Sequence, residues 1–242
     1  MRLSDITSKE FEDKRECVDI VVIPVGSLEA HGQHLPLGTD IFAPGLICDR
    51  IEKRMGDRAW IAPGISYGQS DSLSVYPGTI TIPSEVMAEY VFYVGKSFYD
   101  QGVKKIILMN GHGGNVVALR LAAEKLSRIG AAAVVVNWWM DYLDDILTIT
   151  KTRGHAGEDE TSAMMYYNED LVDMSTLFTN LHKSKYRVYF PNSGLIDLKH
   201  AVTGDPTEAS REKGEKIFDM LEEKMCELIT FMENEEYLVN ED

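Results

Sequence analysis

Cysteine is scarce in this chain of 242 residues, and long hydrophobic runs are absent from it. Its three cysteines, Cys17, Cys48 and Cys226, lie far apart and form no CxxC pair, which argues against a disulfide framework and against a zinc site built from thiolates. No apolar run approaches the roughly 18 residues that a membrane span needs, and the first residues lack the apolar core of a signal peptide. We therefore expect a cytoplasmic protein without a membrane partner.

Basic residues are also few. The 24 Lys and Arg face 39 Asp and Glu, which leaves a formal net charge of -15, and such a surface repels phosphate backbones. We therefore expect a small-molecule substrate and no nucleic-acid polymer as partner. The chain contains no internal repeat, low-complexity tract or linker, so residues 1–242 are predicted to form a single domain.

Three short apolar runs, at 19–25, 104–109 and 131–136, are rich in β-branched residues and predict buried strands. Apolar residues at helical spacing, with capping residues, predict helices over 41–55, 84–101, 116–129 and 205–234. Alternation of strands and helices is typical of an α/β protein with a mostly parallel sheet. The segment 61–82 is expected to form loops that line a site, because glycine and proline recur in it.

The first group of chemically active residues directly follows the first predicted strand. Glu29, His31 and Asp40 lie there, and loops at the carboxyl ends of strands are where open α/β sheets build their sites. Glu29 and His31 are two apart and could serve two neighbouring metal ions, which Asp40 could bridge. Carboxylate and imidazole together suit zinc, iron or manganese. The alternative is a polar loop whose side chains only bond to the backbone.

The second group is the turn Asn110-Gly-His112-Gly-Gly-Asn115, which lies between a predicted strand and a predicted helix. Such a glycine-rich turn can also cradle a phosphate at a helix N-terminus, so a nucleotide-binding loop is the alternative. The turn has neither a GxGxxG pattern nor a P-loop lysine. The imidazole of His112 favours a metal ligand, because a phosphate loop has no need of one.

The third group contains His155, Glu158, Asp159 and Glu160. Three acids in the first turn of a helix complement the helix dipole, which accounts for the acids but not for His155. We expect the turn to orient His155 and one glutamate into a common cleft, as a further ligand and a proton-transfer group.

Four of the six histidines fall in these three groups, each beside a carboxylate or a glycine turn. His182 and His200 have no such neighbours, and we interpret both as ordinary structural or surface residues.

Together the three groups resemble the signatures of the creatininase family, also called creatinine amidohydrolase. The patterns G-S-x-E-x-H-G-x-H-L-P-x-x-T/V-D, N-G-H-G-G-N and H-A-G-x-x-E-T-S are intact here and stand in the same order, and weaker similarity extends over roughly residues 15–225. The resemblance implies a three-layer α/β/α sandwich, a centre of two divalent metal ions and a homo-oligomer, with a hexamer favoured.

Matched residue by residue, the resemblance implies two sets of ligands for Zn, Fe or Mn that share one aspartate: Glu29, Asp40 and His112 for one ion, and His31, Asp40 and Glu160 for the other. Creatininase itself has a glutamate two residues after the histidine of the glycine turn, where this chain has Gly114. Glu160 is the expected substitute. Many members also have a histidine where this chain has Leu73, so a substrate contact is expected to differ.

The resemblance also implies hydrolysis of a non-peptide C–N bond by water that two metal ions activate. His155 is the candidate for stabilising the tetrahedral intermediate or protonating the leaving nitrogen, and Glu158 is a second candidate for moving the proton.

Gly114 counts against creatinine as the substrate. We therefore expect a deformylase acting on 2-amino-5-formylamino-6-ribosylaminopyrimidinone phosphate, a formamide of riboflavin and deazaflavin biosynthesis that archaeal relatives cleave. The alternatives are a creatininase-type hydrolase of a cyclic amide, a hydrolase of a peptide-like amide and, in another class, a non-catalytic nucleotide-binding module.

Two further features concern the substrate. Trp138 and Trp139 follow the third predicted strand; either could wall the pocket, and a pair with one buried and one exposed ring is an equally good interpretation. A phosphate-bearing substrate would need a basic patch, whose candidate contributors, if they are not simply solvated, are Arg153, Lys183, Lys185 and Arg187.

Overall fold

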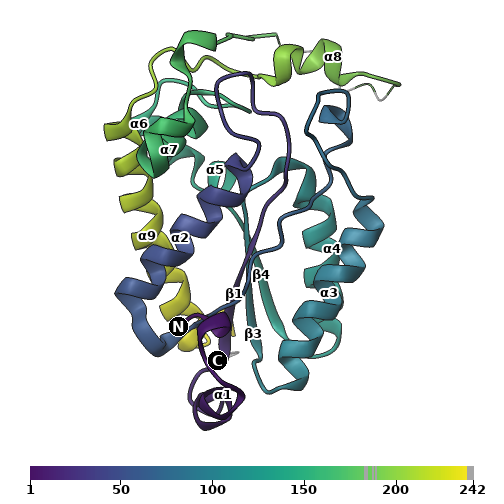
Figure 1. The fold of residues 1–242 in the computed structure, drawn as a ribbon. Coiled ribbons are helices and arrows are strands. Elements are labelled where there is room, and N and C mark those ends of the chain that lie inside the picture. Colours follow the sequence, from purple (N-terminus) through teal and green to yellow (C-terminus); the bar gives the residue numbers. More distant parts are fainter. Residues whose placement is uncertain (183–184, 187, 189, 239–242) are drawn as a thin grey trace.

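The chain folds around a sheet of parallel strands. The computed structural model describes residues 1–182, 185, 186, 188 and 190–238. Within these residues the strands are β1 (Ile20–Val25), β2 (Trp60–Ile61), β3 (Lys105–Asn110) and β4 (Ala132–Asn137). Their order is β2-β1-β3-β4, and each neighbouring pair is parallel (Figure 1). The predicted α/β class with a parallel sheet is confirmed.

Helices cover both faces of this sheet (Figure 1). One layer contains α2 (Thr39–Met55), α7 (Glu158–Asn168) and α9 (Arg211–Glu233), and the other contains α3 (Ser84–Asp100) and α4 (Val116–Arg128). The shorter helices of the described part are α1 (Ser8–Lys14), α5 (Trp138–Asp141), α6 (Leu143–Ile149) and α8 (Gly194–Asp197). The expected three-layer α/β/α sandwich is confirmed.

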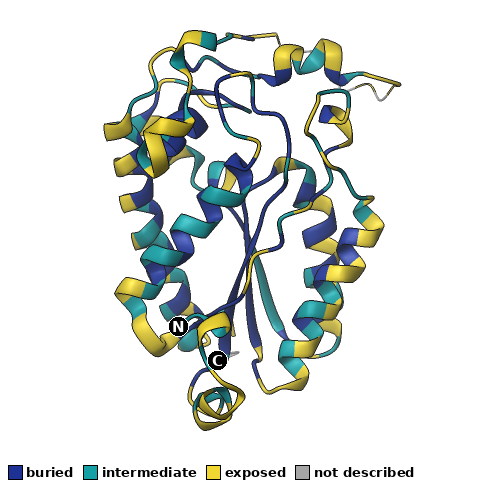
Figure 2. Cartoon of the chain, viewed as in Figure 1, coloured by how far each residue is buried: buried dark blue, intermediate teal, exposed yellow. Residues whose placement is uncertain are grey.

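The central strands separate two hydrophobic cores. In β1, Ile20 and Val22 contact the core beneath α2 and α9, while Val21 and Ile23 contact the core beneath α3 and α4. All four side chains are fully buried, and β1 is dark blue in Figure 2. Side chains alternate across a strand, so a strand that is covered on both faces is a continuous apolar run. For this reason the apolar runs predict β1 and β3 to within one residue at each end.

Several short elements are missing from the sequence prediction, namely α5, α6 and α8 as well as β2 and α1. β2 has only two residues, which is too short to show a pattern, and it begins one residue before the segment 61–82 that was expected to form loops. α1 is a helix of seven residues that begins with a capping box, in which Thr7 and Glu10 bond each other's backbone N–H groups.

The C-terminal helix begins later than expected. α9 starts at Arg211 rather than at 205, because the Ser210 side chain accepts a hydrogen bond from the backbone N–H of Lys213 and so caps the helix there. Of the tail over 235–242 that we expect to be frayed, residues 239–242 lie outside the described residues.

Three strands end side by side at one edge of the sheet. Val25, Asn110 and Asn137 are the last residues of β1, β3 and β4, and they are in register with one another. The first two groups of predicted site residues follow β1 and β3 directly, so the sheet brings them together in space. Each helix in the described part is too short or too polar to cross a membrane.

The contact between α7 and α9 can be tested at Gly214, where a Cβ atom would come within 2.0 Å of the Ser162 carbonyl oxygen. Gly214→Ala is expected to push the helices apart and to lower the free energy of unfolding by about 1–3 kcal/mol. Gly45→Ala in α2 is the matched control, because a Cβ atom there has nothing within 4 Å; it is expected to stabilise the helix by about 0.5–1 kcal/mol. Urea denaturation measures both, and equal effects would contradict the close packing.

Candidate metal centre

Asp40, in the first turn of α2, lies between two histidines. Its Oδ1 atom is 3.0 Å from Nε2 of His31, and its Oδ2 atom is 2.8 Å from Nδ1 of His112. All three side chains are buried. The two carboxylate oxygens therefore face two different imidazoles, as a bridging ligand requires.

Two glycines allow Asp40 to approach the sheet. Gly26 follows β1, and a Cβ atom there would lie 2.5 Å from the Asp40 carbonyl oxygen; Gly111 follows β3, and a Cβ atom there would lie 2.2 Å from the same oxygen. Any larger residue would push the first turn of α2 away. Gly26 and Gly111 therefore make room for the backbone of Asp40 and do not form a phosphate-binding loop.

The two asparagines of the glycine turn hold its backbone. Asn110 Nδ2 donates to the carbonyl oxygen of His112 at 2.9 Å, and Asn110 Oδ1 accepts from the backbone N–H of His112 at 3.1 Å. Asn115 Nδ2 donates to the carbonyl oxygen of Gly26 at 3.0 Å, and its Oδ1 accepts from the N–H of Gln69 at 3.0 Å. These bonds tie the turn to the neighbouring loops and so fix the direction of His112.

Around Asp40 the structure brings together the five residues that the resemblance implies as metal ligands. The groups Glu29–Asp40–His112 and His31–Asp40–Glu160 each have donor atoms within 4.8 Å of one another. His112 Nδ1 lies 3.1 Å from Glu29 Oε1, and His31 Nε2 lies 3.6 Å from Glu160 Oε2. Two sets of three donors that share Asp40 are thus assembled from the loops that follow β1 and β3 and from the first turns of α2 and α7.

The state of Glu29 tests whether a cation fits here. Its side chain is fully buried, and its carboxylate contacts only imidazoles: Oε1 lies 3.1 Å from Nδ1 of His112 and 3.6 Å from Nδ1 of His155. A buried carboxylate needs compensating positive charge, and carboxylate and imidazole together form a donor set for divalent ions. The residues therefore fit divalent metal.

The protonation equilibria agree with this. Burial disfavours the charged form of His31, but Asp40, Glu160 and Glu29 outweigh it and raise the pKa of His31 to about 10. Burial also opposes the charged form of His112, yet Glu29 and Asp40 raise its pKa well above the usual value. Burial raises the pKa of Glu160 to about 8, and the charge of Asp40 adds to this. Protons are thus held where ions would bind, and binding an ion must release them.

Gly114 differs from creatininase, and the structure gives the reason. A Cβ atom at this position would lie 1.8 Å from the carbonyl oxygen of Gln69, so no side chain can stand there. The same carbonyl accepts a hydrogen bond from Nε2 of His112 at 2.8 Å. Because a carbonyl only accepts, Nε2 carries a proton. Nδ1 is therefore the atom that can release its proton and turn its lone pair to an ion between Glu29 and Asp40.

His155 lies beside the five-residue cluster. Its Nε2 donates to the carbonyl oxygen of Ala30 at 2.8 Å, which leaves Nδ1 as an acceptor, 3.6 Å from Glu29 Oε1. The centroid of its ring lies 4.1 Å from the ring centroid of His31. Burial lowers the pKa of His155 to about 4, and the positive charge of His31 acts in the same direction. At neutral pH the imidazole is therefore uncharged, and the lone pair of Nδ1 faces the cluster.

Glu158 does not join the cluster. Its side chain is 1% exposed and accepts hydrogen bonds from the backbone N–H groups of Lys151 and Thr152, each at 2.9 Å. Its other oxygen forms an ion pair of 2.6 Å with Lys213 of α9. These contacts do not favour the predicted role in proton transfer, because both oxygens are engaged away from the metal ligands.

The next two acids continue the same arrangement. Asp159 Oδ1 accepts from the N–H of Gly154 at 3.0 Å, and Glu160 Oε2 accepts from the N–H of Ala156 at 2.7 Å. With Glu158, three consecutive carboxylates at the start of α7 hold the preceding loop at successive points. They do more than complement the helix dipole, since this loop carries His155.

A cavity of about 720 Å³ opens onto the cluster and is lined by Glu29, Asp40, His112, His155 and Glu160, among others. Ser72 and Leu73 line it as well, so part of the segment 61–82 does reach the site.

Trp139 also lines the cavity, whereas Trp138 is buried beneath it. His182 contributes to the wall, although the sequence analysis interprets it as an ordinary residue; no neighbouring motif signals its place. His200 contacts the ring of Phe178 instead. Lys185 lies over the ring of Tyr186 and away from the cavity, while Lys183 and Arg187 lie outside the described residues.

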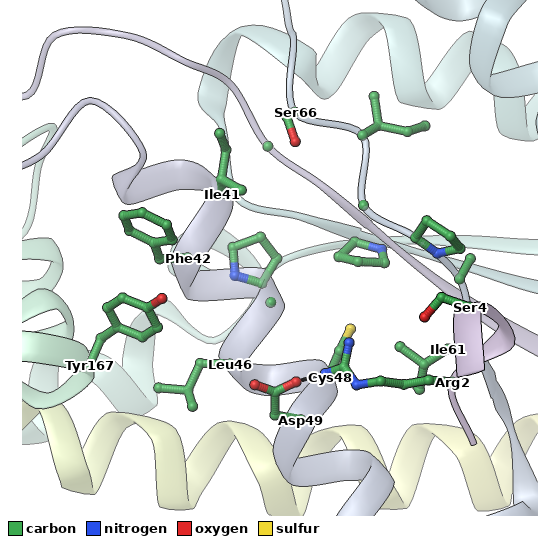
Figure 3. A pocket seen from close by; sticks show the side chains of 18 residues that line it. Arg2, Ser4, Ile41, Phe42, Leu46, Cys48, Asp49, Ile61, Ser66 and Tyr167 are labelled. Atoms are coloured by element: carbon green, nitrogen blue, oxygen red, sulfur yellow. Dashed lines mark ion pairs between the residues drawn. The ribbon is translucent and has the colours of Figure 1, made fainter.

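Figure 3 shows another cavity, of about 330 Å³, between α2 and the edge of the sheet at β2. Arg2 and Asp49 form an ion pair in it, and Phe42, Leu46 and Tyr167 supply apolar surface. None of the five clustered residues lines this cavity, so it is separate from the candidate metal centre.

Fold and site together define a class: a three-layer α/β/α protein with buried carboxylates and imidazoles that could hold metal at the carboxyl edge of its parallel sheet. Residues 4–229 match the family described as Creatininase, creatinine amidohydrolase. The chain belongs to this family and is a metal-dependent amidohydrolase.

Curated relatives differ in what they act on. The mycofactocin precursor peptide peptidase of Mycolicibacterium smegmatis is 31% identical over 83% of this chain and 80% of that protein. The creatinine amidohydrolase of Pseudomonas putida is 28% identical over 94% of this chain and 95% of that protein. Solved structures of a manganese creatininase and of a zinc–zinc creatininase mutant are each 27% identical, with a TM-score of 0.81 and coverage of 94% of this chain and 96% of the other.

Glu158→Gln tests whether this carboxylate supports the loop that carries His155. Loss of the charge weakens the bonds to Lys213 and to two backbone N–H groups, so we expect the free energy of unfolding to fall by about 1–3 kcal/mol. Glu208→Gln is the control, because the exposed Glu208–Lys151 pair is worth only about 0–1 kcal/mol. Urea denaturation at neutral pH measures both. If Glu158→Gln were no more costly than its control, the supporting role would be refuted.

Proposed function

We propose that the chain hydrolyses a small amide with two divalent ions, one held by Glu29, Asp40 and His112 and the other by His31, Asp40 and Glu160. The observation that carries this is Asp40, whose two oxygens face two histidines of different triads. The full burial of the Glu29 carboxylate beside imidazoles supports it. Related creatininase structures contain Mn or Zn.

Bound divalent ions would lower the pKa of a water molecule and polarise the amide carbonyl. The protein's part is to hold the donors rigidly. His112 is oriented through the carbonyl of Gln69, and His31 through the carbonyl of Glu29, 3.1 Å from its Nδ1. Such outer bonds fix the tautomer and the ring direction of a ligand.

His155 is placed to move a proton. It is neutral because of its lowered pKa, and its free Nδ1 faces the cluster while Nε2 is anchored on Ala30. We assign it the task of accepting a proton from the attacking water and delivering it to the leaving nitrogen. Glu158 is assigned a structural task instead.

For the substrate we propose a formamide, namely the formylamino-pyrimidine ribonucleotide expected from the sequence, ahead of creatinine. Gly114 supports this preference, because the space that a glutamate would need is filled by the carbonyl of Gln69. A non-catalytic nucleotide-binding module is disfavoured, since the glycine turn faces carboxylates rather than a basic pocket.

One observation favours a second candidate, a peptide-like amide. A further cavity of about 570 Å³ shares Ser72, His182, Leu198 and Thr203 with the cavity at the metal centre, so the two adjoin. Together they would accept a substrate longer than creatinine. A relative 31% identical is a peptide peptidase by name.

A homo-oligomer, with a hexamer favoured, also remains part of the proposal. Exposed apolar side chains on the neighbouring helices α3 and α4 support it: Val86, Tyr90, Tyr93, Val117 and Leu121. Apolar patches that span two elements are typical of interfaces.

The metal sites can be tested by elemental analysis of protein purified without chelator. We expect about two ions per chain in the wild type. Asp40→Asn should lower the content of both sites, Glu160→Gln should affect one, and each should cut amide hydrolysis by more than the roughly 100-fold that loss of an outer partner costs. His200→Gln, whose exposed residue does not line the cavity, is the control. Wild-type protein without metal, and without activity when metal is added, would refute the proposal.

The substrate can be tested by offering one preparation three amides: the formylamino-pyrimidine nucleotide, creatinine and a short peptide. We expect the nucleotide to release formate with a kcat/KM at least about tenfold above that for either other substrate. This ratio corresponds to an activation free energy about 1.4 kcal/mol lower for the nucleotide. Cleavage of the peptide at the higher rate would establish the second candidate and exclude the deformylase.

A further inference from the structure

The cavity at the metal centre is larger than the centre itself. Its volume of about 720 Å³ lies well within the range of sites for small molecules. Besides the cluster, its wall contains the apolar side chains of Trp139, Leu143 and Leu147, and the basic side chains of Lys151 and Arg153. A substrate that fills this space must extend beyond the amide that reacts.

Arg153 is the cation in this wall that lacks a partner. Lys151 Nζ forms an ion pair of 2.7 Å with Glu208, whereas the guanidinium of Arg153 has no hydrogen bond or ion pair with any described residue. It is exposed, in a chain with 39 acidic and 24 basic residues. Arg15 and Arg128 also lack an ion pair within the described part, but neither lines this cavity.

The backbone on both sides of Arg153 is held in place. The N–H of Thr152 donates to Glu158 at 2.9 Å, and the N–H of Gly154 donates to Asp159 at 3.0 Å. Asp159 interacts with Arg153 electrostatically but forms no ion pair with it. The Arg153 side chain therefore forms no hydrogen bond or ion pair with a described residue, while the backbone that carries it is held in place. Less conformational entropy is lost when such a side chain binds a ligand.

Arg153 is two residues before His155, so their Cα atoms lie within about 7 Å of each other. A guanidinium presents a planar fork of N–H groups that matches the two oxygens of a carboxylate or phosphate. We propose that Arg153 forms an anion subsite in this cavity, and that the substrate carries a carboxylate or phosphate besides the amide that is cleaved. This deepens the proposed function and rests on it for the identity of the reacting bond.

The test measures binding rather than turnover, so that it remains informative if no amide is hydrolysed. Three ligands with one apolar body are titrated by calorimetry into the metal-loaded full chain: phenylpropanoate, phenylpropyl phosphate and neutral phenylpropanol. Wild-type protein is expected to bind at least one anion about 10- to 100-fold more tightly than the alcohol, as for a hydrogen bond to a charged group.

Arg153→Gln should remove most of that preference, and Arg153→Lys should retain part of it, because lysine keeps the charge but loses the fork. Arg128→Gln, an exposed arginine away from the cavity with the same change of charge, should leave the preference intact. The anion whose binding depends on Arg153 identifies the group as carboxylate or phosphate. An equal preference in wild type and Arg153→Gln, an equal loss in Arg128→Gln, or no preference in wild type would each overturn the proposal.

Discussion

The structure of the site depends on the concentration of negative charge around Asp40. Glu29, Asp40 and Glu160 converge with His31 and His112 at the bottom of the cavity, and each of these side chains is buried. Carboxylates at such distances repel one another and have lost their hydration, so they persist together only with compensating positive charge. Protonated histidines supply it in part, as the raised pKa of His31 to about 10 indicates. Bound divalent metal would supply the rest.

The parallel sheet makes this convergence possible. β1 and β3 end in register, and glycines that follow each strand leave room for the backbone of Asp40 at the start of α2. The helix N-terminus then adds its own partial positive charge beside a carboxylate. The apolar residues on both faces of the strands hold this edge rigid. The free energy gained by packing the two hydrophobic cores offsets the unfavourable burial of the charged cluster.

The sequence predicts elements that have a regular pattern of apolar residues, and sites whose residues lie close together along the chain. Continuous apolar runs predict β1 and β3, and the first two groups of site residues follow those strands directly. The two residues of β2 carry no pattern, and Glu158 looks like a proton-transfer group until its partner Lys213, which lies 55 residues away, is known. His182 and the carbonyl of Gln69 reach the site through loops whose paths no local rule predicts. Local chemistry was thus predictable, while the assignment of each oxygen to its partner was not.

Glu160 belongs to helix α7 and not to the glycine turn, and this placement has a structural consequence. At Gly114 a ligand would belong to the same turn as His112, and its position would depend on β3 alone. Glu160 instead belongs to α7, which packs on α9 and is tied to it by the Glu158–Lys213 ion pair. The same turn of α7 also holds the loop that carries Arg153 and His155. The geometry of the candidate triad His31–Asp40–Glu160, the position of His155 and the wall of the cavity at Arg153 are therefore set by a single helix junction, so displacement of α7 must alter all three together.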